Sequence, residues 1–103
     1  MAIQRTEAEQ IDVKQAVQKA IAYIRELYQG EALPNLRLEE VEFSESDDRW
    51  HVTVGYTVTE QGEQSNALIT ALGGSATRSW REYKIIEIDA YTGAARSMKI
   101  RKL

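Results

Sequence analysis

The stretch that decides the fold class spans residues 50–59 and reads WHVTVGYTVT. Its apolar and polar side chains alternate, so each set occupies one face of a β-strand. The apolar set is Trp50, Val52, Val54, Tyr56 and Val58, and the polar set is His51, Thr53, Gly55, Thr57 and Thr59. A strand with one apolar and one polar face is typical of an antiparallel sheet that is covered on one side.

The covering layer is predicted to be an N-terminal helix. Apolar residues recur at steps of three and four along residues 13–28, which is the spacing of one helix face. Thr6 and Glu9 have the spacing of a capping box, so the helix is predicted to begin beside Thr6 and to run for about six turns. Gly30 and Pro34 predict its end, because glycine readily adopts the left-handed conformation and proline cannot continue a helix.

Three further strands are expected. Residues 36–45 change their apolar phase near Glu39 and Glu40, which predicts a bulge or bend at that point. Residues 83–90 read YKIIEIDA and form the next strand. The predicted fold class is therefore α+β, with one long N-terminal helix packed on a mainly four-stranded antiparallel sheet in the order α-β-β-β-β.

The last two strands are joined by residues 91–94, where Gly93 is suited to a positive φ angle in a turn. The final strand then places Met98 and Ile100 on one face and Ser97, Lys99 and Arg101 on the other. All of residues 1–103 are expected to form one domain.

A long, flexible connection is predicted at residues 60–79. Its middle, residues 67–72, reads ALITAL and is apolar, although structureless segments of this length are uncommon in compact domains. One interpretation is a pair of strand extensions joined by a disordered tip, or one helical turn on the core. The other is a mobile apolar arm that docks into a partner or a second copy. The candidate partner-binding residues are Leu68, Ile69, Leu72, Arg78, Trp80 and Arg81.

The charges divide along the chain. Residues 31–48 carry seven acids and one base, whereas residues 78–103 carry seven bases and three acids. One interpretation is two segments that attract each other or two solvated faces; the other is a basic C-terminal strand presented to an acidic partner. Arg78, Trp80, Arg81, Tyr83 and Lys84 also interleave aromatic and basic side chains, as a single-strand nucleic-acid surface does. The net charge of −3 argues against nucleic-acid binding.

Catalytic and metal-binding residue patterns are missing from the sequence. There is no cysteine, which excludes thiolate chemistry and cysteine-ligated metals. His51 is the only histidine, and it lies on the polar face of its predicted strand, where a histidine is more often a solvated side chain than a metal ligand. No Gly-x-Ser-x-Gly elbow or phosphate-binding loop is present. We therefore expect no catalytic residue, no metal site, no cofactor and no enzyme activity. No apolar stretch is long enough to cross a bilayer and no secretory signal is visible, so a cytoplasmic location is expected.

Most of the chain resembles in outline the small PepSY-type domains, with a long N-terminal helix, a strand that begins at Trp50 and a later strand-turn-strand. In that family a strand of the form Tyr-x-Val-x-Val-Asp is followed by a Thr-Gly turn and a final strand. Tyr83, Ile88, Asp89, Thr92 and Gly93 carry the resemblance here. Cystatin-like proteins share the general architecture of a helix wrapped by a sheet. The resemblance implies this fold and a non-catalytic role, and it names no partner.

Two functional hypotheses follow from the sequence. The first is a non-catalytic protein-interaction or regulatory module that binds a protein partner, or itself, through the sheet face and residues 60–79. The alternative is a small-ligand-binding domain with a pocket between helix and sheet. Its polar groups would come from Tyr23, Tyr56, Tyr83, His51 and nearby carboxylates.

Overall fold

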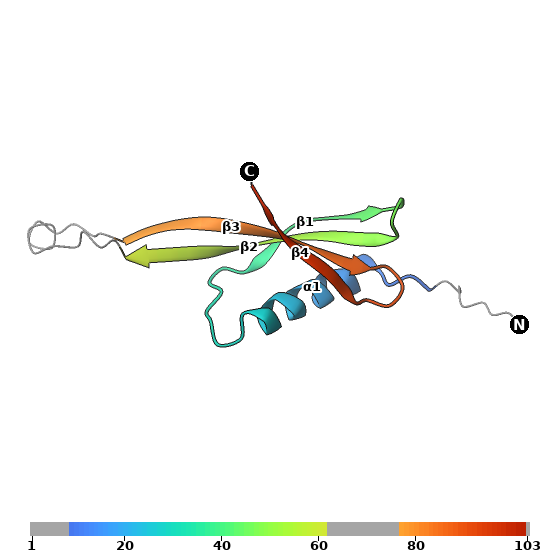
Figure 1. Cartoon of the computed structure of the whole chain (residues 1–103), viewed down its shortest axis with the longest axis horizontal. Helices are drawn as coiled ribbons and strands as arrows, with labels where there is room; N and C mark the ends of the chain where they lie inside the picture. The colour runs from blue at the N-terminus through green and yellow to red at the C-terminus, as the bar shows by residue number, and fades with distance from the viewer. Residues whose placement is uncertain (1–8, 62–76, 103) are drawn as a thin grey trace, which may run out of the picture.

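The computed structural model describes residues 9–61 and 77–102 of the chain. One helix, α1 (Val13–Leu27), packs on one face of an antiparallel sheet, as Figure 1 shows. The sheet has four strands in the order β1-β2-β3-β4. The strands are β1 (Arg37–Ser44), β2 (Arg49–Gln61), β3 (Thr77–Asp89) and β4 (Ala95–Arg101). The predicted α+β fold and the order of its elements are confirmed.

The helix begins later than the sequence suggested. Its N-cap is Asp12, whose carboxylate accepts a hydrogen bond from the Gln15 backbone N–H, while the Gln15 side chain accepts one from the Asp12 backbone N–H. The prediction of a helix start at Thr6 and of about six turns is therefore wrong, because α1 has 15 residues. The backbone N–H of Ile11 donates to the carbonyl of Ala90 at 2.8 Å, so the chain before Asp12 is held against the end of β3. That hydrogen bond lies outside the helix and could not be read from helical periodicity.

The hydrophobic core lies between α1 and the face of the sheet that the sequence marked as apolar. Ala16, Ala20 and Ile24 of the helix are fully buried. They pack against buried side chains of β2 and β3, namely Val52, Val54, Tyr56, Ile86 and Ile88. The small alanines let the helix approach the sheet closely. The alternation in residues 50–59 therefore predicted the buried face correctly.

A bulge in β1 brings two consecutive glutamates to the open face of the sheet, which is the face away from α1. The pairing of β1 with β2 shifts register between Leu38 and Glu40, as expected from the phase change. Glu39 forms an ion pair with Arg81 of β3, and Glu40 forms one with Arg101 of β4. The two oppositely charged segments of the sequence thus attract each other across the sheet, which is the first interpretation of the charge division.

The hairpin between β3 and β4 is fixed by Asp89. One carboxylate oxygen accepts hydrogen bonds from the backbone N–H groups of Tyr91 and Thr92, both at 2.9 Å, and the other oxygen accepts one from Arg96 at 3.2 Å. These interactions lower the pKa of Asp89 to about 2, the two backbone hydrogen bonds contributing most. Gly93 has a φ angle of 76°, as predicted for this turn.

Candidate functional site

β2 and β3 continue together beyond the rest of the sheet. β1 pairs with β2 only as far as Gly55, and β4 pairs with β3 only as far as Tyr83, whereas β2 and β3 stay paired out to Gln61 and Thr77. We call residues 57–61 and 77–81 the projecting ribbon, which leaves the helix-covered part of the sheet in Figure 1. Residues 60–61 and 77–79 are therefore strand rather than loop, which confirms the strand extensions expected in one interpretation of the connection.

The outer edge of the projecting ribbon on β3 carries unpaired backbone groups. Successive residues of an antiparallel strand point their N–H and C=O groups to opposite edges. The Asp89 N–H donates to the Ala94 carbonyl at 2.8 Å on the β4 side, and β3 continues in regular register from there to Thr77. The backbone groups of Arg81 and Ser79 therefore point to the same side, where β4 has already ended.

The hydrogen bonds of β2 also show that the backbone groups of Arg81 point outward. The Thr57 N–H donates to the Pro34 carbonyl at 2.9 Å and so points away from β3. Thr57 and Arg81 therefore form a non-hydrogen-bonded pair of the ladder, in which both residues face outward. Within the described residues, the backbone groups of Ser79 and Arg81 have no hydrogen-bond partner on their outer side.

A groove of about 370 Å³ runs along this edge. Trp80 and Ile100 provide its apolar surface, and Ile100 is 68% exposed. The Trp80 Nε1 donates to Glu82 at 3.1 Å, and the Arg78 guanidinium lies 5.2 Å from the centre of the Trp80 ring. The Trp80 side chain, which forms the apolar wall, is thus positioned by one hydrogen bond and one cation–π contact. The lining residues are Trp80, Arg81, Glu82, Tyr83, Ile100, Arg101 and Lys102.

Two of the three bases in the groove are already paired. Arg81 binds Glu39 and donates to the Asn35 carbonyl at 2.8 Å, and Arg101 binds Glu40. Lys102 is exposed and forms no ion pair with any residue that the structure describes. The groove therefore combines the charge of Lys102, the apolar surface of Trp80 and Ile100, and the unpaired backbone edge of β3.

The structure brings two of the predicted partner-binding residues together. Trp80 and Arg81 both line the groove, and Arg78 holds the Trp80 ring. Leu68, Ile69 and Leu72 lie outside the described residues. Ile100 and Lys102 also line the groove, but they were not among the partner-binding residues predicted from the sequence. The position of Ile100, one residue before the end of β4, could have indicated that its side chain is exposed.

The aromatic and basic residues around Trp80 do not form one stacking surface. Strand alternation places Trp80 and Glu82 on the face of β3 that continues from the core, and Arg81 and Tyr83 on the open face. The interleaved pattern of residues 78–84 is thus divided between the two faces, and Lys84 is mostly buried on the core side.

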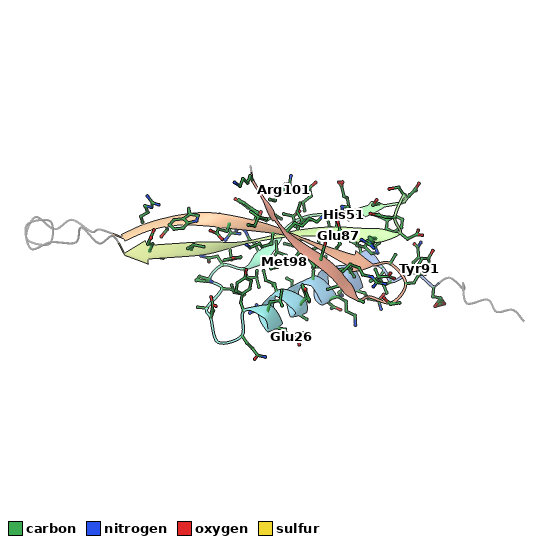
Figure 2. The ribbon with its side chains drawn as sticks, viewed as in Figure 1. Glu26, His51, Glu87, Tyr91, Met98 and Arg101 are labelled. Atoms are coloured by element: carbon green, nitrogen blue, oxygen red, sulfur yellow. The ribbon has the colours of Figure 1, made fainter. Side chains whose placement is uncertain are left out.

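The open face also carries His51, between two carboxylates. Its Nε2 lies 3.8 Å from Asp47 and 3.8 Å from Glu87, the residue that pairs with His51 between β2 and β3 (Figure 2). Burial raises the pKa of Glu87, but Arg49, Lys99 and His51 together lower it by more than burial raises it. The pKa of Glu87 is therefore below its usual value. Glu87 forms ion pairs with Arg49 and Lys99. Within residues 9–61 and 77–102, no group of three or more histidine, aspartate or glutamate side chains could hold a metal ion.

No protein-family model, curated protein or solved structure gives a significant match to the chain. The resemblance to PepSY-type domains therefore stays a prediction. In the part of the chain that the structure describes, no helix is long and apolar enough to cross a membrane.

Proposed function

We propose that this chain is a non-catalytic protein-interaction module that pairs an extended segment of a partner protein with the outer edge of β3. The observation that carries the proposal is the unpaired backbone of Ser79 and Arg81, beside the groove of Trp80 and Ile100. Exposed strand edges are templates for pairing with another chain, and proteins usually block or cover them. Strand addition at such an edge is a recurring mode of peptide recognition.

The position of β4 defines the path of the partner segment. Arg101 ends β4 opposite Tyr83, so a new strand on Arg81 and Ser79 would continue the line of β4 along β3. The main chain of the segment would supply hydrogen bonds, and alternate side chains would meet the groove.

The groove favours a segment of defined composition. The indole of Trp80 and the exposed Ile100 side chain suit an apolar residue of the partner. Lys102 suits an acidic residue near that apolar residue, since the other two bases are occupied by Glu39 and Glu40. We therefore expect extended ligands that combine apolar, β-branched residues with an acid.

A peptide selection tests this function. A display library of random peptides is selected against the chain, and the affinity of the enriched peptides is measured for two proline variants. Ser79→Pro removes the outward N–H of β3, whereas Thr59→Pro removes the outward N–H of the directly opposite residue on β2. Both variants lose the Thr59–Ser79 side-chain hydrogen bond, so this loss is common to them and they differ in the strand edge that proline blocks.

The proposal expects enriched peptides to bind Thr59→Pro normally and Ser79→Pro at least about tenfold more weakly. Equal affinity for both variants would place the site elsewhere. Light scattering on the free chain and on both variants tests for self-association. If the chain is a dimer that Ser79→Pro dissociates and Thr59→Pro leaves intact, a second copy of the chain occupies the same edge.

A further inference from the structure

A second groove lies at the other edge of the projecting ribbon. It has a volume of about 420 Å³ and opens between the segment that follows α1 and the start of the ribbon. Its lining residues are Tyr28, Glu31, Ala32, Leu33, Pro34, Tyr56, Thr57, Val58, Thr59 and Glu82. Among the described residues, the lining contains two carboxylates, two phenols and several aliphatic side chains, and it contains no basic side chain.

Glu82 is held in this groove by neutral donors alone. The Tyr56 hydroxyl donates to one carboxylate oxygen at 3.4 Å, and the Trp80 Nε1 donates to the other at 3.1 Å. Within the described residues, neither Glu82 nor Glu31 forms an ion pair. Lys84 lies on the same face of β3, but its ammonium group is not within ion-pair distance of Glu82 and the residue does not line the groove.

The walls of the groove suit an organic cation rather than a hydrated metal ion. The ring centroids of Tyr28 and Tyr56 lie 6.2 Å apart and the ring planes are tilted by 53°, so the two rings pack against each other as one aromatic wall. Leu33 and Val58 add apolar surface. Aromatic faces attract ammonium and guanidinium groups through the ring quadrupole. Burial, together with Tyr28 and Glu82, raises the pKa of the Tyr56 phenol, so this side chain stays a neutral donor.

We propose that this groove binds the ammonium group of an alkylamine, with Glu82 as the counter-ion, Tyr28 and Tyr56 beside the cation on one wall, and Leu33 and Val58 against the alkyl chain. A part-buried carboxylate without a cationic partner is costly, and a bound ammonium ion supplies that partner. The ligand is either a free amine or a lysine side chain of a peptide. Glu82 lines both grooves and accepts the hydrogen bond from Trp80, so the two sites share this residue. The second site is therefore tested with small probes that have no strand to pair with the outer edge of β3, which separates it from the proposed function.

An NMR titration tests the site with defined probes. n-Butylammonium chloride, n-butanol and the capped tripeptide acetyl-Gly-Lys-Gly-amide are titrated into the labelled chain at constant ionic strength. We expect saturable shifts at Tyr28, Val58 and Glu82 with butylammonium, with the lysine peptide, or with both, and none with n-butanol. The tighter of the two charged probes identifies a free amine or a lysine side chain as the natural ligand class.

Three variants complete the test. Glu82→Gln removes the charge and keeps a single accepting oxygen, so it retains only one of the hydrogen bonds from Tyr56 and Trp80. It should weaken butylammonium binding at least about tenfold. Glu31→Gln, at an exposed position of the groove, should weaken it by about threefold or less. Glu26→Gln removes a charge from the exposed surface of α1, outside the groove, and should have no effect (Figure 2). Equal shifts with n-butanol, or full binding to Glu82→Gln, would overturn the proposal.

Discussion

Glu40 and Arg101, which belong to the two edge strands of the sheet, form an ion pair across its open face. The pair crosses two intervening strands, and Arg101 also donates to the Thr53 hydroxyl of β2 at 3.2 Å. The bulge in β1 makes this contact possible, because it brings Glu40 to the same face as Glu39. The acidic first strand and the basic last strand are thereby joined within one molecule.

This ion pair should contribute modestly to stability. The side chains of Arg101 and Glu40 are 35% and 48% exposed, and pairs with this exposure contribute about 1 kcal/mol or less. A double-mutant cycle of Glu40→Gln and Arg101→Gln, measured by urea unfolding, should give a coupling of that size that shrinks in 1 M salt. No coupling at low salt would mean that the two side chains are not paired in solution.

Gly55 leaves room for the second ion pair of the open face. A Cβ atom at this position would lie 2.7 Å from Glu39 Oε2, 2.8 Å from an Arg81 guanidinium nitrogen and 3.0 Å from the Tyr83 ring. Gly55→Ala should therefore push Glu39 and Arg81 apart and destabilise the chain by about 1 kcal/mol. The coupling between Glu39→Gln and Arg81→Gln should also be lost in the Gly55→Ala background. A coupling that survives there would contradict this packing.

The chain should lose stability in acid through Asp89. Its pKa is about 2 in the folded chain against 3.8 ordinarily, so the unfolded chain binds the proton more readily. The stabilisation is complete above about pH 4 and is lost as the pH falls from about 4 to about 2, and it amounts to about 1–2 kcal/mol after solvent screening. Unfolding free energies measured between pH 2 and 5 should show this loss. Asp89→Ala should be less stable at pH 7 and should lose less between pH 4 and pH 2.

The N-cap of α1 offers a direct comparison of two positions. Asp12→Ala removes the acceptor for the Gln15 N–H and should cost about 1 kcal/mol in thermal or urea unfolding. Thr6→Ala should change the unfolding free energy by less than about 0.5 kcal/mol, because the helix begins only at Val13. A larger loss for Thr6→Ala than for Asp12→Ala would restore the helix start that the sequence suggested.

Local patterns predicted the elements well. Period-two alternation in β2 assigned its buried face, and the phase change at Glu39 and Glu40 located the bulge. Both features depend on residues that are close in sequence. The start of α1 was mispredicted because Thr6 and Glu9 also have the spacing of a capping box, whereas the box that caps α1 is formed by Asp12 and Gln15.

The candidate sites were harder to predict because they depend on where strands end. Trp80 and Arg81 stood out by residue type, but their groove exists because β4 stops opposite Tyr83 while β3 continues. Glu82 gave no signal in the sequence. Its role in the second groove arises from Tyr56, Trp80 and the segment after α1, which meet only in the folded chain.

Amide hydrogen exchange at Ser79 and Arg81 tests the central claim most directly. In the free monomer, these two amides should exchange much faster than those of Trp80 and Glu82, which point toward β2. A selected peptide at saturation should protect Ser79 and Arg81 by about a hundredfold or more and leave Thr59 unchanged. If Ser79 and Arg81 still exchange freely with the peptide bound, the partner does not pair with β3 and the proposed function is wrong.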